Sequence, residues 1–388
     1  MSDGALYAVE IRYDVRIPVR DGLLLSANVF MPVARAANER FPAILEMLPY
    51  RKDDWRHCSD HQRMTYFAQR GYAGCRLDIR GTGSSPGIAR DEYTPEETRD
   101  GYDAVDWLAA QPWCNGNIGM WGISYGGFTA LQVAMLRPPA LKAIIPMYAT
   151  DDRYIDDVHY NGGCLTASDL AQYAISMVAM NAMPPRAEYV GHDWAAQWKA
   201  RLEQTPPWLI VWLRQQTDGP YWRVGSVALD YTRITCAIFQ IGGWADSYTS
   251  PVLRIQERCV NAPRKALIGP WVHSLPDSAY PGPNIDYLHE MTRFFDYWLK
   301  GIDNGVMDEP PLTIYREEYT PPEAFPARKN GTWHSEAAYP IARTQLRTLY
   351  LGDMALGPHP PAPSPAAAGE GEQMSRSPRP WRWERGWG

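Results

Sequence analysis

The stretch from Gly119 to Gly127, GMWGISYGG, places a serine between two glycines where an apolar run gives way to a helical pattern. A G-x-S-x-G sequence between a strand and a helix suits a sharp turn with an exposed serine, because larger neighbours would clash in so tight a bend. The sequence therefore predicts that Ser124 is a nucleophile at a strand-to-helix turn. The rest of the chain must then supply a base, an acid and donors for an oxyanion.

Short apolar runs on both sides of this turn predict buried parallel strands, and helical patterns separate most of them. The predicted strands are residues 41–48, 72–78, 117–122, 141–147, 234–243 and 264–270. The predicted helices are residues 60–70, 95–110, 125–137, 249–260 and 285–301. This alternation predicts an α/β fold with a doubly wound sheet, preceded by a hairpin that turns at Asp21-Gly22.

The spacing of these elements divides the chain into segments. Residues 1–148 and 233–305 are predicted to form the two parts of one α/β domain. Residues 149–232 contain amphipathic helical runs and no clear buried strand, so they are predicted to form a helical cap over the strand ends, where open α/β sheets bind ligands. Residues 306–357 predict the start of a β-rich second domain, and residues 358–388, rich in Pro, Ala, Gly and Arg, predict a disordered tail.

Composition limits the classes of partner. The chain of 388 residues has a formal net charge of −6 and no basic block, so no nucleic-acid partner is expected. Its six widely spaced cysteines contain no C-x-x-C pair, which favours free thiols in a reducing compartment. The chain has neither an N-terminal signal pattern nor an apolar run of about 18 residues. We therefore expect a cytoplasmic protein without a membrane partner, and composition predicts no oligomeric state.

No cofactor and no metal are predicted. His57 and His61 are four residues apart and could share a helix face, but the residues between them lack the glutamate of an H-E-x-x-H zinc site. The stretch RGTGSSPG (80–87) is rich in glycine, but no acidic residue lies in the βαβ context of a nucleotide-binding loop, so the stretch is interpreted as a turn near the active site.

Two residues that follow later strands complete a candidate triad with Ser124. Asp246 follows the predicted strand 234–243, and His273 follows the predicted strand 264–270. His273 would take the serine proton as general base, and Asp246 would hold the imidazole in the useful tautomer. A lone aspartate is more often a helix cap and a lone histidine a surface residue. The triad rests on the coincidence of three residue types, in the order found in α/β hydrolases, each at a strand end.

Further candidates surround this triad. The backbone N–H of Tyr125 is predicted to be one oxyanion donor, and the hydroxyl of Tyr50, from the loop after the first parallel strand, is a candidate for a second; plain packing is the alternative for Tyr50. Trp244 and Tyr248 are predicted pocket residues that would favour an apolar or aromatic acyl group. The acidic run DDRYIDDVHY (151–160) is interpreted as a solvated helix start, with recognition of a substrate ammonium group as the alternative.

Five motifs in order resemble those of the X-Pro dipeptidyl-peptidase-like serine hydrolases, the CocE/NonD family of cocaine esterase and α-amino-acid ester hydrolase. They are LPYRKDD (48–54), LDIRGTGSS (77–85), DGYDAVDWLAAQPWCNGNIGMWGISYGG (100–127), GGWADSY (242–248) and GPWVHS (269–274). The resemblance covers about residues 10–355. It implies an α/β-hydrolase fold with a helical cap insertion and a C-terminal jelly roll, the triad Ser124, Asp246 and His273, and Tyr50 as an oxyanion donor. The chain departs from that pattern where the Pro-rich tail replaces most of the jelly roll, so a truncated β segment is expected.

Together these features predict a serine hydrolase that cleaves an acyl ester or amide through an acyl-enzyme intermediate. The expected substrate is a small ester or amide or a short peptide. Two alternatives stay open, an X-Pro dipeptidyl aminopeptidase and an inactive remnant that lacks most of the C-terminal domain.

Overall fold

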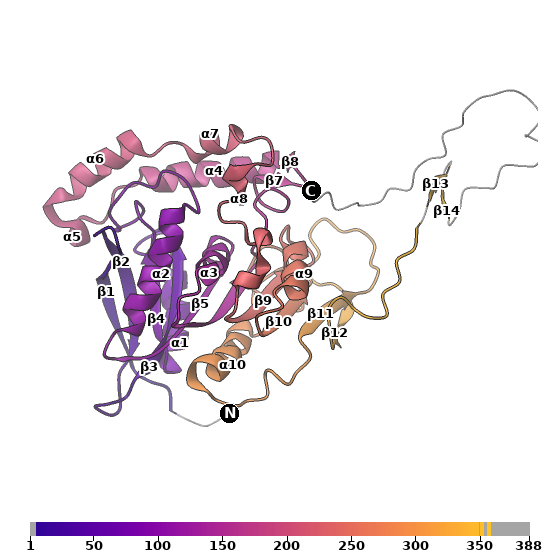
Figure 1. Cartoon of the computed structure of the whole chain (residues 1–388), viewed down its shortest axis with the longest axis horizontal. Coiled ribbons are helices and arrows are strands. Elements are labelled where there is room, and N and C mark those ends of the chain that lie inside the picture. Colours follow the sequence, from indigo (N-terminus) through magenta and orange to yellow (C-terminus); the bar gives the residue numbers. More distant parts are fainter. Residues whose placement is uncertain (1–4, 349, 353–354, 358–388) are drawn as a thin grey trace, which may run out of the picture. The chain divides into compact units, whose positions relative to one another are not determined.

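The computed structural model describes residues 5–348, 350–352 and 355–357. Ten of its strands form one mixed, mostly parallel sheet in the order β1-β2-β4-β3-β5-β6-β9-β10-β11-β12 (Figure 1). They are β1 (Val9–Pro18), β2 (Leu24–Pro32), β3 (Phe41–Leu48), β4 (Ala73–Asp78), β5 (Cys114–Ile123), β6 (Leu141–Met147), β9 (Ala237–Gly243), β10 (Arg264–Gly269), β11 (Leu312–Glu317) and β12 (Gly331–Glu336). All six predicted parallel strands are confirmed, because β4, β3, β5, β6, β9 and β10 pair in parallel.

Strands β3 and β4 are buried along their whole length. Every residue of β3 and β4 is buried, which explains why these strands read as continuous apolar runs rather than as an alternation. The predicted hairpin is confirmed as the antiparallel pair β1 and β2, and Gly22 in its turn has a φ of 88°, a conformation that costs a glycine little. The antiparallel strand β2 also pairs with β4, so the sheet begins with two antiparallel pairings.

Helices lie on both sides of this sheet (Figure 1). They are α1 (His57–Gln69), α2 (Pro95–Ala109), α3 (Tyr125–Met135), α9 (Thr249–Arg258) and α10 (Tyr287–Lys300), and each overlaps a predicted helix. Local signals set their ends: the Thr94 side chain accepts a hydrogen bond from the Glu97 N–H at the start of α2, and the left-handed Gly301 ends α10. Helix α10 packs on β5, where a Cβ on Gly119 would lie 2.6 Å from the Phe295 ring.

Between β6 and β9 the chain forms a mostly helical segment that lies across one end of the sheet (Figure 1). It contains the short hairpin β7 (Tyr160–Asn161) and β8 (Cys164–Leu165), the helices α4 (Ala167–Ala182), α5 (Ala187–Val190), α6 (Trp194–Gln204), α7 (Trp208–Leu213) and α8 (Pro220–Arg223), and the 3₁₀ turns η1 (Gly191–Asp193), η2 (Val227–Leu229) and η3 (Tyr231–Arg233). We call this segment the cap. Its own apolar cluster is built around Met177, Trp208, Trp212 and Trp222, all buried.

Two strands follow α10, in the segment that was predicted to be rich in β structure. Strand β11 pairs in parallel with β10, and β12 pairs antiparallel with β11, so both extend the main sheet. The predicted domain boundary near residue 305 therefore does not interrupt the hydrogen bonding of the sheet. Strands β13 (Tyr350–Gly352) and β14 (Ala355–Gly357) form a separate antiparallel pair, and the predicted tail, residues 358–388, lies outside the described residues.

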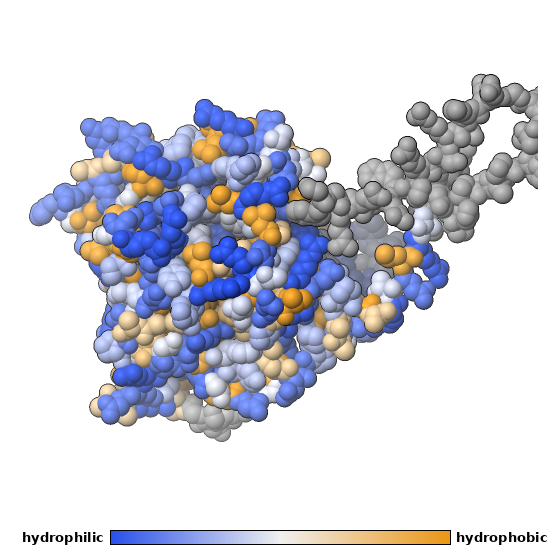
Figure 2. Space-filling model, viewed as in Figure 1, coloured by the Kyte–Doolittle hydropathy of each residue, from blue (hydrophilic) through white to orange (hydrophobic). Residues whose placement is uncertain are grey.

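The face of the molecule drawn in Figure 2 is largely polar. Over the face in view, hydrophilic residues predominate and apolar residues form small scattered groups (Figure 2). None of the helices in the described residues is long and apolar enough to cross a membrane. All six cysteines are free thiols.

Candidate active site

Ser124 stands at the turn between β5 and α3 in a strained backbone conformation. Its φ is 58° and its ψ is −123°, a region that residues other than glycine rarely occupy. The flanking glycines permit this turn, because a Cβ on Gly122 would lie 2.5 Å from the Gly126 Cα and one on Gly126 would lie 2.6 Å from the Leu48 side chain. The Ser124 carbonyl then accepts the first hydrogen bonds of α3, from Gly127 and Phe128. The predicted strand-to-helix turn is confirmed.

Asp246 and His273 meet at the ends of two neighbouring strands. Asp246 follows β9 and His273 follows β10, and Asp246 Oδ2 lies 2.6 Å from His273 Nδ1. The Asp246 side chain is 1% exposed, whereas that of His273 is 42% exposed, so the carboxylate is shielded and the imidazole is accessible. The Tyr248 N–H donates to Asp246 Oδ1 at 2.7 Å, so each carboxylate oxygen has a hydrogen-bonding partner.

A cavity of about 620 Å³ joins these residues. Ser124, His273, Tyr50 and Tyr248 all line it, within the size range of small-molecule sites. Helix α4 of the cap forms part of the opposite wall, through Tyr173 and other residues. The cavity therefore brings together the predicted nucleophile, the predicted base and the predicted oxyanion tyrosine.

The two predicted oxyanion donors differ in how they are held. Tyr125 is the first residue of α3, so its backbone N–H has no partner within the helix. Its side chain is buried, and its hydroxyl donates to Glu97 Oε2 at 2.9 Å. The Tyr50 ring packs edge-on against Tyr125, with ring centroids 5.8 Å apart. Burial raises the pKa of Tyr50, so its hydroxyl keeps its proton and can donate a hydrogen bond at neutral pH.

The two predicted pocket residues lie in different places. Tyr248 lines the cavity, and its hydroxyl donates to Asp157 Oδ1 at 3.1 Å. Trp244 is not among the lining residues, because its indole N–H donates to the Tyr315 carbonyl of β11 at 2.6 Å and the ring turns toward that strand.

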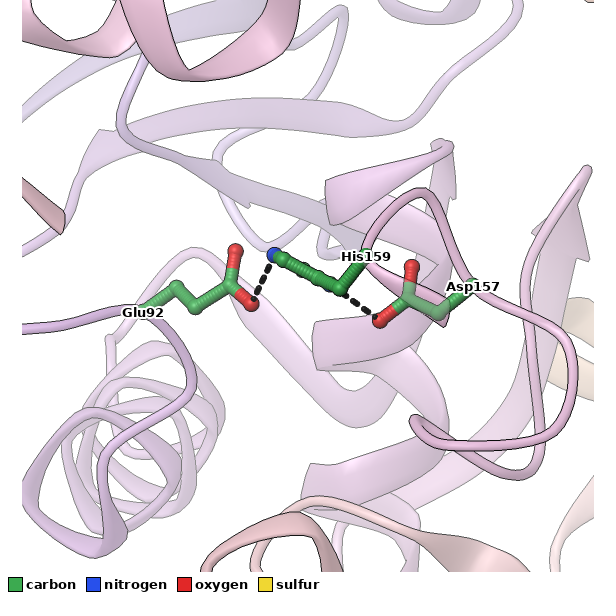
Figure 3. A group of neighbouring side chains, drawn as sticks. All are labelled: Glu92, Asp157 and His159. Atoms are coloured by element: carbon green, nitrogen blue, oxygen red, sulfur yellow. Dashed lines mark hydrogen bonds and ion pairs between the residues drawn. The ribbon is translucent and has the colours of Figure 1, made fainter. Parts of the chain in front are cut away.

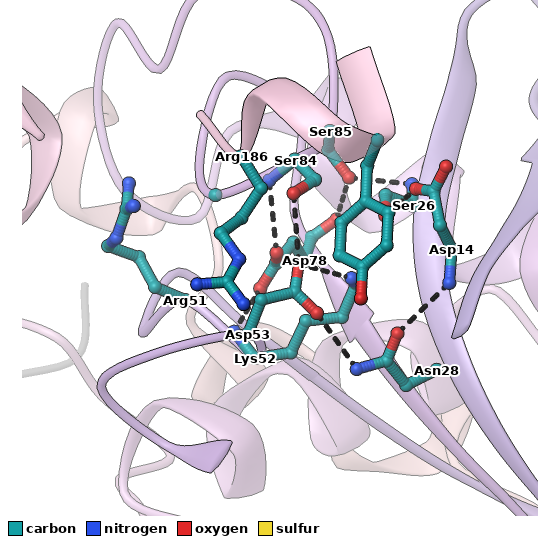
Figure 4. Close-up of polar contacts among 12 residues, drawn as sticks. Asp14, Ser26, Asn28, Arg51, Lys52, Asp53, Asp78, Ser84, Ser85 and Arg186 are labelled. Atoms are coloured by element: carbon teal, nitrogen blue, oxygen red, sulfur yellow. Dashed lines mark hydrogen bonds and ion pairs between the residues drawn. The ribbon is translucent and has the colours of Figure 1, made fainter. Parts of the chain in front are cut away.

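A buried polar network supports the loop that carries Tyr50 (Figure 4). Lys52 Nζ lies 2.6 Å from Asp53 Oδ2, and both side chains are almost completely buried. Asp53 also accepts hydrogen bonds from the Asn28 amide and the Ser84 hydroxyl, each at 2.9 Å. The Lys52 N–H donates to Asp78 Oδ1 at 2.9 Å. The glycine-rich turn 80–87, which supplies Ser84, thus holds the Tyr50 loop in place.

A second buried cluster lies behind the cavity wall and has the composition of a metal site (Figure 3). His159 lies between two carboxylates, with Nε2 2.9 Å from Glu92 Oε1 and Nδ1 2.9 Å from Asp157 Oδ2. Arg153 also contacts Glu92 Oε1, at 2.7 Å. Burial lowers the pKa of His159, but the two carboxylates outweigh it and raise the pKa to about 9. The imidazolium and the guanidinium therefore already balance both negative charges, and we assign the group as a structural cluster rather than a metal centre.

This charge-balanced cluster contacts two walls of the cavity. The Tyr173 hydroxyl lies 3.3 Å from Glu92 Oε2, and the Tyr248 hydroxyl bonds to Asp157. The cluster therefore fixes aromatic side chains that face the substrate space, although none of its own members lines that space.

The acidic run 151–160 is engaged in structural contacts. Asp151 and Asp156 both form ion pairs with Arg254 of α9, and Asp157 belongs to the buried cluster. None of these carboxylates lines the cavity. Sequence reasoning did not identify Asp157 and His159 individually, and their spacing of two residues within an acidic run was the only available signal.

Glu97 is a further buried group that the sequence did not single out. Both the Tyr125 hydroxyl and the Tyr93 N–H donate to Glu97 Oε2. Burial raises the pKa of Glu97 to about 8. In the sequence, a glutamate three residues after Thr94 is an ordinary helix-capping pattern at the start of α2. Only the packing of α2 against α3 in the structure shows that Glu97 also contacts Tyr125.

Known proteins are similar to this chain in sequence and in fold. The cocaine esterase of Rhodococcus is 26% identical over 375 residues, which cover 87% of this chain and 62% of that protein. A CocE/NonD family hydrolase from Staphylococcus aureus has a similar fold, with a TM-score of 0.69 and 20% identity over 89% of this chain and 59% of its own. An α-amino acid ester hydrolase has a TM-score of 0.65 at 22% identity and covers 92% of this chain. The chain spans about three fifths of the length of these relatives.

The match to a family model decides the classification. The model of the X-Pro dipeptidyl-peptidase S15 family matches residues 21–275, which include the elbow at Ser124, the Asp246–His273 pair and the cap. The chain therefore belongs to the X-Pro dipeptidyl-peptidase S15 family of serine hydrolases, together with the CocE/NonD hydrolases.

Proposed function

We propose that this protein is a serine hydrolase that cleaves acyl esters or amides through a covalent acyl-enzyme. The observation that carries the proposal is that Ser124, on a strained elbow, shares one cavity with His273, whose Nδ1 contacts a buried carboxylate. A strained serine next to an accessible imidazole that is oriented by a shielded carboxylate is the arrangement of a nucleophile, a base and an orienting acid.

The chemistry follows from these positions. With Asp246 ionised, the imidazole keeps its proton on Nδ1 and presents Nε2 as the acceptor for the Ser124 proton. The serine oxygen attacks the substrate carbonyl, and the resulting oxyanion receives hydrogen bonds from the Tyr125 N–H and the Tyr50 hydroxyl. His273 then protonates the leaving group, which departs. Water, activated by the same histidine, releases the acid and restores Ser124.

The proposal is tested by treating the purified protein with a fluorophosphonate probe and measuring the intact mass. We expect one probe adduct on the wild type and none on Ser124→Ala. Ser247 also lines the cavity, so Ser247→Ala is a matched control that should keep the adduct. A folded wild type without an adduct would contradict the assignment and favour an inactive remnant. An adduct that persists in Ser124→Ala would assign the reactive nucleophile to another residue.

A dipeptidyl peptidase is the second candidate, and the family match carries it. Comparing turnover of 4-nitrophenyl esters with that of Xaa-Pro nitroanilides by the unlabelled wild type separates the two activities. Preference for the nitroanilides would replace the esterase assignment without affecting the role of Ser124.

A further inference from the structure

The catalytic cavity is lined by few formally charged side chains, and these differ in how far they are exposed to solvent. Among the described residues that line it, only Arg56 and Asp169 carry a formal charge, apart from the titratable His273. The Arg56 side chain is 24% exposed and lies at the start of α1, on the loop that carries Tyr50. Asp169 is exposed on the first turn of α4, where water screens its charge. Arg56 is therefore the more buried of the two charged side chains that line the cavity.

Arg56 is incompletely paired within the protein. Its closest carboxylate is Asp60, with Asp60 Oδ1 3.6 Å from Arg56 Nε, which is beyond hydrogen-bonding distance. The buried Arg56 Nε has no hydrogen-bond partner among the described residues. The rest of the Arg56 side chain is partly exposed and lines the cavity, where its N–H groups can donate to an anion; a carboxylate is a suitable planar partner, because it can accept two guanidinium N–H bonds in parallel.

The neighbouring charges leave an excess of positive charge at this point. Asp60 is already engaged by Arg76, at 2.8 Å, and by Arg63, at 3.2 Å. The other carboxyl of the group is Glu46, and burial raises its pKa, which favours its neutral form. Three arginines thus share one fully engaged carboxylate and a second that burial tends to neutralise.

Arg56 lies near the groups that are proposed to take part in the reaction. Burial raises the pKa of Tyr50, and the charge of Arg56 acts in the opposite direction, so the guanidinium lies close enough to influence the Tyr50 hydroxyl. Both side chains line the cavity that contains Ser124. An anion bound at Arg56 would therefore belong to the molecule being cleaved.

We propose that Arg56 binds a carboxylate of the substrate, so that the preferred substrates are esters that carry a negative charge. The proposal rests on the proposed serine hydrolase function. It also disfavours substrates with a free ammonium group near Arg56, because like charges in a partly desolvated cavity repel each other.

The test compares esters that differ only in charge. On the acyl side, mono(4-nitrophenyl) adipate is matched with 4-nitrophenyl hexanoate, which has the same chain length. On the alcohol side, 4-carboxyphenyl hexanoate is matched with phenyl hexanoate. We expect the wild type to have a higher kcat/KM for the anionic member of one pair, and the pair in which this occurs locates the carboxylate. Arg56→Gln should lower that anionic-to-neutral ratio about tenfold or more, the usual effect of losing a hydrogen bond to a charged group.

Two further variants make the test specific. Arg56→Lys keeps the charge without the planar fork, so it should retain part of the preference. Arg12→Gln removes one exposed charge, ion-paired with Glu10 on β1, and should leave the ratio at its wild-type value. An unchanged ratio in Arg56→Gln, or no anionic preference in either pair, overturns the proposal. Fluorophosphonate labelling of Ser124 in each variant reports whether the site is assembled, so failure of Arg56 recognition is distinguishable from failure of the hydrolase assignment.

Discussion

At the scale of single residues, the hydroxyl of Tyr50 is the most direct test of the proposed oxyanion hole. Tyr50→Phe removes this donor and keeps the ring that packs on Tyr125, so we expect kcat to fall about 10²- to 10³-fold with a smaller change in KM. Steady-state ester hydrolysis measures this. Tyr7→Phe is a matched control, because its hydroxyl donates to Glu39, away from the cavity. Equal activity of the Tyr50→Phe variant and the wild type would assign Tyr50 to packing alone.

The sequence predicted the residues that lie next to a strand end and have a recognisable neighbour. Ser124, Asp246 and His273 each follow a buried strand, and parallel strands present their carboxyl ends at one edge of a sheet, so their convergence was predictable. Arg56 and Glu97 were not predicted, because Arg56 is singled out by the cavity that it lines and Glu97 by its hydrogen bond from Tyr125 of α3. No local spacing encodes such contacts. Trp244 was predicted from proximity in sequence, but its indole bonds to β11, a contact between distant segments.

At the scale of elements, the bounds of the six parallel strands were predicted to within three residues, whereas the cap was predicted only in outline. Strands β3 and β6 match their predicted bounds, because fully buried parallel strands are continuous apolar runs bounded by polar turns. The cap helices α5, α7 and α8 are short and lack strong periodicity. Their positions depend on the buried Trp208, Trp212 and Trp222, whose contacts are made between elements.

Several buried polar contacts attach the cap to the sheet domain, and the contact made by Arg201 gives a prediction at this scale. Arg201 of α6 is 1% exposed, and its guanidinium donates to the carbonyls of Gly83 and Ser85 in the glycine-rich turn. Burial lowers its pKa to about 10. Arg201→Met leaves both buried carbonyls without this donor, so we expect the free energy of unfolding to fall by about 2 kcal/mol and the cap to be cleaved faster by proteases.

Urea unfolding and limited proteolysis under native conditions measure these effects. Arg186→Met, in the same cap, removes an exposed ion pair with Glu188 and should change the free energy of unfolding by less than about 0.5 kcal/mol. If the two variants behave alike, Arg201 does not attach the cap.

At the scale of the whole molecule, buried titratable groups set the pH dependence of stability. The pKa of Glu97 is raised to about 8 and that of His159 to about 9, so both bind a proton more tightly in the folded than in the unfolded state. Their contributions are complete below the unfolded pKa of each group and are lost as the pH rises through 8 and 9. The pKa of Glu92 is lowered, despite burial, by His159 and Arg153, so its contribution is lost in acid instead. The free energy of unfolding should therefore be highest near pH 5 and fall toward pH 9.

Glu97→Gln separates one of these contributions from the rest. Glutamine keeps an acceptor for the Tyr125 hydroxyl but cannot ionise, so the variant should lose less stability than the wild type between pH 5 and pH 8, where one bound proton corresponds to about 1.4 kcal/mol per pH unit. Glu96→Gln, on the same turn but exposed and paired with Arg99, should keep the wild-type slope. Urea unfolding at several pH values measures both slopes. Parallel curves for the wild type and Glu97→Gln would mean that the pKa of the Glu97 carboxyl is the same in the folded and the unfolded state. The protonation of Glu97 would then not contribute to stability.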